Sequence, residues 1–317
     1  MNELLPKVTI IIPTRPGQAE IPAVVAARGL DYPRELVEIL VARGKQPAVQ
    51  RNTAIKTAQG DLIYFLDDDS RPLAANLRRG VRHFQNPKVT MVGGPNLCPN
   101  EAPGLEKIFS VVLSSWLAFG PSRARYDKVG QVRPSGEKEL ILCNLMARRK
   151  DLVELGGFDE SLYPNEENAL MDELQKRGSQ LLYDPDFMVH RRPRPTLKAF
   201  VKMLFNYGRG RAEQFRLHPT PGSVLNFVPP LFCLYLVLAP FFGLLGLVPL
   251  GFYAVAVVGQ TLGSAATKGF GKAVLALPLV VLTHICYGIG FWRGLFTKVQ
   301  RGQKNTGIEV AIEKISF

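Results

Sequence analysis

The chain has 317 residues, of which 46% are hydrophobic and 21% charged, and its net charge is +12. Its four cysteines have no metal-ligand spacing, which argues against a zinc module or a disulfide framework. Residues 1–187 carry 24 basic and 24 acidic side chains, so the positive excess begins only at Arg191, without interleaved aromatics. We therefore expect no nucleic-acid partner.

Apolar strands alternate with helices at the start of the chain. Strands are predicted over residues 7–13, 37–42 and 61–66, and helices over 19–29 and 47–58. Solid hydrophobic strands between helices indicate a mostly parallel sheet that is covered on both faces. The predicted fold class of this front part is therefore α/β and Rossmann-like.

Three consecutive carboxylates, Asp67, Asp68 and Asp69, directly follow the third strand. Open α/β sheets bind ligands at the carboxyl ends of their strands. Carboxylates at positions i and i+2 of an extended segment point the same way, and their oxygens suit Mg²⁺ or Mn²⁺ carrying phosphate. The pattern indicates a metal-diphosphate site. The alternative is a polar turn, because the run Asp-Asp-Asp-Ser-Arg-Pro is rich in turn-forming residues.

Charge nearly vanishes from Phe227 onward. No Asp, Glu, Lys or Arg occurs between Phe227 and Leu262, a stretch longer than the roughly 20 residues of one bilayer crossing. A second uncharged run covers Ala273 to Trp292. The first residues lead straight into a strand and lack signal-peptide architecture. We expect a multi-pass protein of the cytoplasmic (inner) membrane whose front domain faces the cytoplasm.

Basic residues cluster just before the first apolar run, as is typical of the cytoplasmic flank of a span. Among them, Leu197, Phe200, Val201 and Leu204 follow helical spacing. This indicates an amphipathic helix that lies on the membrane, or one docked on the soluble domain. Two or three spans are predicted. Because three would place Arg293 outside, an even number or an interfacial segment agrees better with the positive-inside rule.

Three sequence blocks carry a family resemblance. They are VTIIIPTR at 8–15, QRNTAIKTAQGDLIYFLDDDS at 50–70 and CNLMARRKDLVELGGFDESLYPNEENALMDELQKRG at 143–178. In order and spacing they resemble the family-2 inverting glycosyltransferases with a GT-A fold, over about residues 7–192. Two further stretches, SSWLAFGPSRARYDKVG at 114–130 and HRRPRPTLKAFVKMLFNYGRGRAE at 190–213, look like the succinoglycan-type exopolysaccharide branch of that family.

The resemblance implies an order of domains. A cytoplasmic GT-A domain at 1–192 would comprise a nucleotide-sugar half at 1–95 and an acceptor and catalytic half at 96–192. A basic amphipathic interfacial segment at 193–225, an α-helical membrane domain at 226–296 and a tail at 297–317 would follow.

The resemblance also implies roles in donor binding. Asp69 and Asp67 match the DxD pair that binds the metal, Mg²⁺ or Mn²⁺, and His190 resembles a third metal ligand; a core histidine is the alternative there. Arg51 matches a family position near the donor, where a solvated helix face is the alternative. The residues expected to bind the donor are Pro13, Thr14, Arg15, Arg51, Asn52, Asp67, Asp68 and Asn144.

For catalysis, Glu167 matches the position of the family's base, although the usual residue there is Asp. Inversion at an anomeric carbon needs one base to take the acceptor's proton, so one well-placed carboxylate suffices. Glu166 and Asp159 are alternatives for that role. An ordinary helix N-terminus, where acids favour the dipole, is the other interpretation of these acids.

Two departures from the family affect binding. The second strand ends in Arg43 and Lys45 where relatives commonly carry acids for the nucleobase, so these cations are candidates for phosphate contact instead. The Gln-x-x-Arg-Trp motif of processive members is missing, which favours transfer of a single sugar. Arg209 and Arg211 are candidates for an acceptor phosphate or for lipid headgroups.

The resulting functional expectation is a metal-dependent inverting glycosyltransferase. It would move one sugar from a nucleotide-sugar donor to a lipid-linked acceptor in exopolysaccharide, O-antigen or related glycan assembly. Its expected partners are that donor, that acceptor, membrane lipids and other glycan assembly proteins. The alternatives are a polyprenyl-phosphate sugar synthase of the same fold and a catalytically inactive membrane scaffold.

Overall fold

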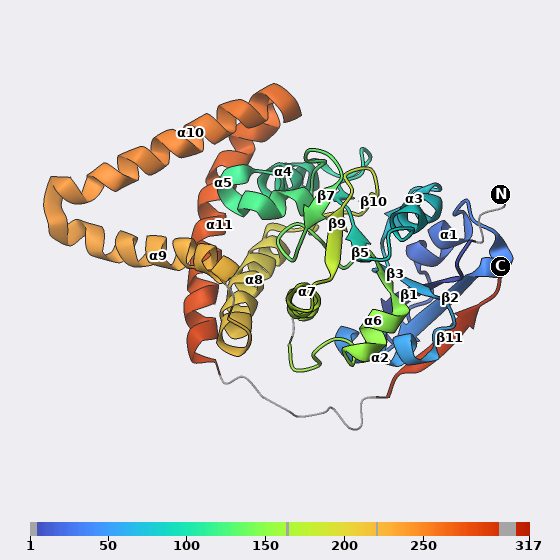
Figure 1. The fold of residues 1–317 in the computed structure, drawn as a ribbon. Coiled ribbons are helices and arrows are strands. Elements are labelled where there is room, and N and C mark those ends of the chain that lie inside the picture. The colour runs from blue at the N-terminus through green and yellow to red at the C-terminus, as the bar shows by residue number, and fades with distance from the viewer. Residues whose placement is uncertain (1–4, 163–164, 220, 298–308) are drawn as a thin grey trace.

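An α/β body carries a long helical extension in the computed structural model, which describes residues 5–162, 165–219, 221–297 and 309–317 (Figure 1). The first elements follow the predicted alternation to within about three residues. They are β1 (Val8–Thr14), α1 (Pro22–Arg28), η1 (Arg34–Leu36), β2 (Val37–Arg43), α2 (Pro47–Thr57) and β3 (Leu62–Leu66). Helix α2 begins with Pro47, whose fixed φ suits a first helical position.

One eight-stranded sheet forms the centre of the body, in the order β11-β2-β1-β3-β8-β5-β9-β7. Its remaining strands are β5 (Val89–Gly93), β7 (Arg133–Ser135), β8 (Asn144–Arg148), β9 (Gln180–Tyr183) and β11 (Ala311–Ile315). Strand β1 pairs in parallel with β2 and β3, and β5 with β9, whereas β8 runs antiparallel between β3 and β5. The predicted α/β class is confirmed, but the prediction of a mostly parallel sheet is wrong. Among the described strands of this sheet, three pairings are parallel and four are antiparallel, because β8 and β11 run against their neighbours and β7 against β9.

Helices cover both faces of the sheet, and successive residues of each strand enter opposite cores. Ile10 and Tyr64 belong to one buried cluster, Ile11 and Phe65 to the other, as the two-residue period of a strand requires. The helices of the body are α3 (Asn76–His83), α4 (Gly104–Leu113), α5 (Trp116–Phe119), η2 (Gly120–Arg125), α6 (Arg149–Glu154) and α7 (Glu166–Lys176). A small second sheet joins β4 (Arg71–Pro72), β10 (Val189–His190) and β6 (Asn96–Leu97).

The C-terminal residues return to the first strands of the sheet and form an edge strand there. Strand β11 pairs antiparallel with β2, with Ala311 opposite Arg43. Two ion pairs reinforce the register: Arg43 Nη2 lies 2.9 Å from Glu313 Oε2, and Lys314 Nζ lies 2.9 Å from Glu38 Oε1. The predicted tail at 297–317 therefore contributes a strand to the sheet.

The helical extension consists of α8 (Leu197–Leu217), η3 (Pro221–Phe227), α9 (Val228–Leu238), η4 (Ala239–Leu247), α10 (Val248–Lys268) and α11 (Phe270–Phe296). The apolar face of α8 is buried in a cluster with α4 and α11, and Phe200 stacks on Phe109 at a centroid distance of 4.2 Å. This packing agrees with the second interpretation of the amphipathic helix, that of a helix docked on protein.

Glycines bring the backbones of α8 and α11 into direct contact. A Cβ added at Gly208 would lie 2.0 Å from Tyr287 O, and one at Gly290 would lie 2.1 Å from Phe205 O. Small residues at a helix crossing permit this close approach. Two helical stretches, Gly222–Lys268 and Phe270–Phe296, are long and apolar enough to cross a membrane, although 44% of the most apolar window of the second is buried within the protein.

We predict opposite effects of two glycine-to-alanine substitutions. Gly290→Ala places a methyl group against the α8 backbone and should lower the free energy of unfolding by about 1 to 3 kcal/mol, the usual cost of overpacking. The matched change Gly259→Ala meets nothing within 4 Å and should stabilise α10 by about 0.5 to 1 kcal/mol. Thermal unfolding in detergent measures both. Equal stabilisation by the two variants would contradict the close packing of α8 on α11.

Candidate functional site

The site lies where three parallel strands end. Strands β1, β2 and β3 run in register, so Thr14, Arg43 and the carboxylates after Leu66 gather at one edge of the sheet. The Thr14 carbonyl accepts hydrogen bonds from Gln50 Nε2 at 2.8 Å and from the Gly44 amide at 3.0 Å. Helix α2 therefore fixes the ends of the first two strands.

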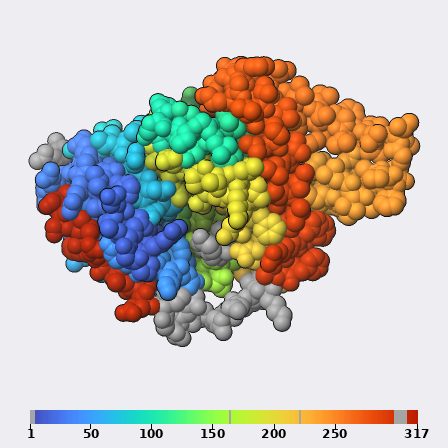
Figure 2. Space-filling model, turned by 180° about the vertical axis from the view of Figure 1, so that it is seen from behind, coloured from blue at the N-terminus to red at the C-terminus, as the bar shows by residue number. Residues whose placement is uncertain are grey.

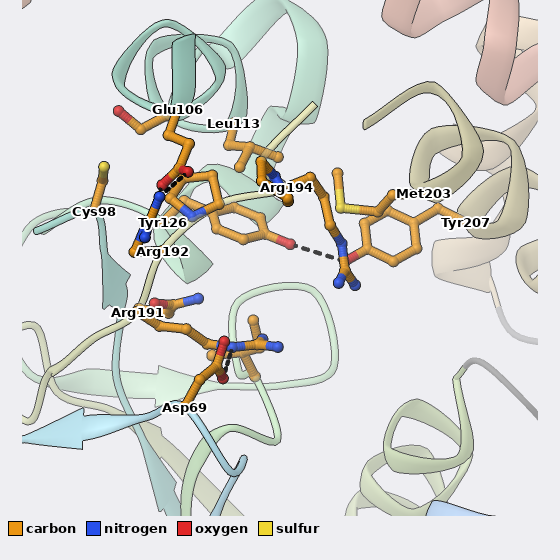
Figure 3. Close-up of a pocket in the computed structure, with 15 residues that line it drawn as sticks. Asp69, Cys98, Glu106, Leu113, Tyr126, Arg191, Arg192, Arg194, Met203 and Tyr207 are labelled. Atoms are coloured by element: carbon orange, nitrogen blue, oxygen red, sulfur yellow. Dashed lines mark hydrogen bonds and ion pairs between the residues drawn. The ribbon is translucent and has the colours of Figure 1, made fainter. Parts of the chain in front are cut away.

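Two arginines hold the carboxylates after β3. Arg51 Nη2 lies 3.1 Å from Asp67 Oδ1, and Arg191 Nη1 lies 3.1 Å from Asp67 Oδ2. Arg191 Nε also donates to Asp69 Oδ1 at 2.5 Å, the ion pair at the bottom of Figure 3. Burial lowers the pKa of Arg191, but the two carboxylates outweigh it, and the net shift is upward. Arg191 is thus a permanent cation between the two aspartates.

Asp67 and Asp69 fit a divalent ion that shares its coordination shell with phosphate. Both carboxylates contact the guanidinium of Arg191, Asp67 through Nη1 and Asp69 through Nε. Within the described part of the chain, no three or more His, Cys, Asp or Glu side chains group as a metal site. Mg²⁺ is commonly held by one or two carboxylates together with substrate phosphates, so a two-carboxylate set is sufficient.

His190 does not join these aspartates in such a group. It lies in β10, where its backbone is opposite Arg71 and Leu97. Asp68 lies between the two aspartates, and its carbonyl accepts a hydrogen bond from the Ala23 amide at 3.0 Å. The structure therefore brings together Asp67 and Asp69 of the predicted metal set, and it adds Arg191.

Helix α2 places two neighbouring residues of the predicted donor set in different roles. Arg51 is buried and bridges Asp67 and Glu166, with Nη1 3.1 Å from Glu166 Oε1, so it is not a solvated helix face. Asn52 accepts a hydrogen bond from the Phe158 amide at 2.8 Å and donates to the Phe158 carbonyl and to Glu160 Oε1, both at 2.9 Å. Asn52 therefore holds the loop that leads toward α7.

Helix α7 separates its first two acids. It begins after Asn165, whose φ of 95° is in the left-handed region. Glu166 is buried beside Arg51; burial and the neighbouring Glu167 raise its pKa to about 7, although Arg51 opposes this shift. Glu167 instead lines a cavity, with Oε1 4.0 Å from Arg125 Nη1. Of the two neighbours, Glu167 is the one presented to a ligand.

The other predicted residues are engaged by the protein itself. Asp159 is exposed and accepts hydrogen bonds from the amide and hydroxyl of Ser161, so it stabilises a turn. Asn144 is fully buried; its Oδ1 accepts from Tyr64 Oη at 2.8 Å and its Nδ2 donates to Phe187 O at 2.6 Å.

The predicted residues at the ends of β1 and β2 differ in exposure. Arg43 pairs with Glu313 of β11 and donates to the Gln18 carbonyl at 2.8 Å. Arg15 is exposed, and Thr14 is buried beside Pro13.

Two cavities meet at the site. The first, of about 300 Å³, lies beside Asp69 and the basic segment after β10 (Figure 3). The second, of about 350 Å³, contains Glu167. Tyr126, Ile141 and Tyr207 line both cavities, and the hydroxyls of the two tyrosines lie 3.3 Å apart. Asp69 and Glu167 therefore face adjacent cavities that share a wall.

The second cavity combines cations with apolar walls. Arg211 Nη1 lies 2.6 Å from Glu137 Oε2, and Lys138 Nζ lies 3.1 Å from Glu137 Oε1. Burial would raise the pKa of Glu137, but these cations lower it to about 2, so it remains ionised. The cavity also reaches the helical extension, through lining residues Leu204, Leu225, Val228, Pro229, His284 and Tyr287.

The two predicted acceptor arginines are separated. Arg211 is buried and lines the second cavity. Arg209 lies 3.8 Å from Glu213, and its backbone contacts Gly294 of α11. It is not among the described residues that line either cavity.

Comparison with known proteins agrees with this geometry. Residues 62–264 match the family described as Glycosyl transferase family group 2. The succinoglycan biosynthesis protein ExoA of Rhizobium meliloti is 30% identical over 199 residues, which are 60% of this chain and 56% of that protein. The pre-mycofactocin glycosyltransferase of Mycobacterium tuberculosis is 29% identical over 178 residues, 55% of this chain and 36% of that protein. The matches thus span about half or less of these relatives.

A solved structure shares the fold. The mannosyltransferase PcManGT from Pyrobaculum calidifontis, in complex with GDP-Man and Mn²⁺, superposes with a TM-score of 0.54 at 20% identity. The superposition covers 92% of this chain and 87% of that chain. It confirms the predicted GT-A fold.

We predict that the charge of Glu166 limits stability at high pH. Its pKa is about 7 in the folded protein, above its ordinary value of 4.5. Between these values the unfolded chain releases a proton that the folded chain retains, so stability falls as pH rises. Glu166→Gln should therefore raise the free energy of unfolding at pH 8.5, by about 1 to 3 kcal/mol, and leave it unchanged at pH 4.

Thermal unfolding at the two pH values measures this difference. Glu173→Gln, on the same helix but half-exposed, is the matched control and should match the wild type at both. A loss of stability in Glu166→Gln at pH 8.5 would mean that a charged Glu166 is favourably paired with Arg51.

Proposed function

Because the chain belongs to the family 2 glycosyltransferases, we propose that it is a metal-dependent inverting enzyme that moves one sugar from a nucleotide-sugar donor to a lipid-linked acceptor. The observation that carries this proposal is the arrangement of the two cavities. Asp69 faces one and Glu167 faces the other, with Tyr126 and Tyr207 common to both. A donor and an acceptor bound there would have their reacting ends at the shared wall.

On the donor side, Asp67 and Asp69 would hold the metal. A divalent ion there would neutralise charge on the nucleoside diphosphate that leaves. The Mn²⁺ and GDP-Man in the neighbour's structure support this proposal. Arg191, Arg192 and Arg194 line the same cavity and offer guanidinium groups to phosphate oxygens. The residues expected at the nucleoside, Pro13, Thr14 and Arg15, stay a prediction.

On the acceptor side, Glu167 is the proposed base. It would take the proton from the acceptor hydroxyl while the diphosphate departs from the opposite face of the sugar. Arg125, whose Nη1 lies 4.0 Å from Glu167 Oε1, would orient the carboxylate. Asn52 acts indirectly, since it holds the loop that precedes α7.

The shape and charge of the second cavity support a lipid-linked acceptor. Its apolar wall comes from helices that are apolar enough for a membrane, and its polar wall carries Arg125, Lys138 and Arg211. A phosphate on a lipid would match both walls. The role of ExoA in succinoglycan biosynthesis supports a place in exopolysaccharide or related glycan assembly.

A second candidate is a polyprenyl-phosphate sugar synthase, whose acceptor is the lipid phosphate itself. The three cations near Glu167 favour this reaction, because they would hold the phosphate beside the base. The two candidates are distinguished by offering either bare undecaprenyl phosphate or a lipid-linked saccharide as acceptor. A scaffold without activity is disfavoured by the intact Asp67, Asp69 and Glu167.

We predict that Glu167→Gln abolishes transfer and spares donor binding. The assay is transfer by the purified protein against a panel of nucleotide sugars with Mn²⁺ and a lipid acceptor. Loss of the base should lower kcat by about 10² to 10⁴-fold. Glu173→Gln on the same helix is the matched control and should retain kcat. If Glu167→Gln turned over at the wild-type rate, Glu167 would not be the catalytic base.

We also predict that Lys138→Gln weakens acceptor binding. Lys138 belongs to the cationic wall, and its loss leaves the Arg211–Glu137 pair in place. The KM for a phosphate-bearing lipid acceptor should rise about tenfold or more, as expected for one lost charged hydrogen bond. The KM for the donor should stay unchanged. Arg209→Gln, outside the cavity, should alter neither value; an equal rise in both variants would favour a general effect of surface charge.

A further inference from the structure

An apolar hairpin, formed by α9, η4 and α10, projects away from the body (Figure 1), and Figure 2 shows it as a wedge on the far side from β11. Between Phe227 and Leu262 the hairpin contains no Asp, Glu, Lys or Arg. Its large side chains point outward: Phe241, Leu244 and Leu245 are each more than 80% exposed. An exposed apolar surface of this extent indicates a membrane or protein partner.

Both ends of the hairpin are attached to the protein, the start near the last turns of α11 and the end just before its first turn. At its start, Trp292 Nε1 donates to the Pro230 carbonyl at 2.9 Å. At its end, Lys268 Nζ lies 2.8 Å from Asp127 Oδ2 of the body, and Gln260 Oε1 accepts a hydrogen bond from the Leu117 amide at 3.1 Å. A hairpin with both roots on one body leaves and returns through the same membrane surface.

Helix α11 lies along the body rather than apart from it. Its first residues follow the Lys268–Asp127 ion pair, and near its last turn Arg216 Nη1 donates to the Gly294 carbonyl at 3.1 Å. Between these ends it packs backbone to backbone on α8, a helix that carries Arg209, Arg211 and Glu213. Charged side chains at the centre of a bilayer are costly, so the α8–α11 pair belongs at the membrane surface.

The two arms of the hairpin differ in length, and its turn is apolar. Helix α10 has 21 residues and is about 31 Å long, which matches the roughly 30 Å hydrocarbon core, whereas α9 has 11 residues and is about 16 Å long, so the shorter arm reaches only about half of that depth. The turn, η4, reads Ala-Pro-Phe-Phe-Gly-Leu-Leu-Gly-Leu and has no group suited to water on the far side. Its Gly246 carbonyl is satisfied internally, by Tyr235 Oη at 2.6 Å. Such a turn belongs in hydrocarbon.

We propose that the α9–η4–α10 hairpin inserts into a single leaflet from the catalytic side, and that α11 lies along that surface without crossing. The occupant of the apolar surface is then the acyl chains of one leaflet. Exposed Lys272 and Arg293, at the two ends of α11, would meet anionic headgroups of the same leaflet. Under this proposal the described helices do not span the membrane, in place of the two or three spans predicted from the sequence. The conflict with the positive-inside rule then no longer arises.

This insertion also connects the leaflet with the second cavity. Val228 and Pro229, at the root of α9, line that cavity together with Glu167. A lipid-borne group could therefore pass from the leaflet to the base without leaving the protein surface. The proposed topology is inferred from the attachments of the hairpin, and it does not depend on the proposed reaction.

Single cysteines and a membrane-impermeant maleimide test this topology in the full chain. Leu244→Cys reports the turn, Lys272→Cys and Arg293→Cys report the two ends of α11, and Val25→Cys, exposed on α1, marks the catalytic side. Labelling is compared in intact spheroplasts and in inside-out vesicles, with the wild type as the background from native cysteines. Thermal unfolding of each variant identifies any that misfolds.

We expect Lys272→Cys and Arg293→Cys to be labelled only from the face that labels Val25→Cys. Leu244→Cys should be labelled from neither face until detergent is added. Labelling of Leu244→Cys from the opposite face would show that the hairpin crosses, and labelling of the two α11 sites from opposite faces would show that α11 crosses. Labelling of Leu244→Cys from the catalytic face would show that the hairpin is not inserted. Loss of transferase activity with the expected labelling pattern would count against the proposed function alone.

Discussion

The site depends on the sharing of Asp67 between two arginines. Arg51 comes from α2 and Arg191 from the segment after β10, and Arg51 also holds Glu166 at the start of α7. One ion-pair chain therefore fixes four separate elements around the end of β3. The carboxylates thus keep their positions only because cations surround them.

This arrangement gives the site two different faces. The ends of the parallel strands and the basic segment after β10 make a basic face beside Asp69, whereas α7, η2 and the helical extension make a partly apolar face beside Glu167. The glycines that dock α11 on α8 bring the apolar hairpin next to this second face. In the proposed function, membrane attachment and the approach of an acceptor would both depend on this helix packing.

Local patterns in the sequence predicted the strands of the donor half, the carboxylates after β3 and the apolar C-terminal region, because each depends on nearby residues. Contacts between distant residues could not be predicted in this way. The sequence marks Arg191 only as the start of a basic stretch, and its pairing with Asp67 depends on how β10 folds back. Strand β11 pairs with β2 across most of the chain, without a strong alternating pattern of its own. The amphipathic spacing of α8 is the same for a membrane surface and for a protein surface, and only the position of Phe109 distinguishes them.

The central claim is that Asp67 and Asp69 bind a nucleoside diphosphate through a divalent metal. Isothermal titration of GDP and UDP into the purified protein, with Mn²⁺ or with EDTA, tests it most directly when wild type and Asp69→Asn are compared. We expect one of the two nucleotides to bind wild type with Mn²⁺, and we expect this binding to be lost with EDTA and in Asp69→Asn. Binding of equal strength in EDTA and in the variant would contradict it.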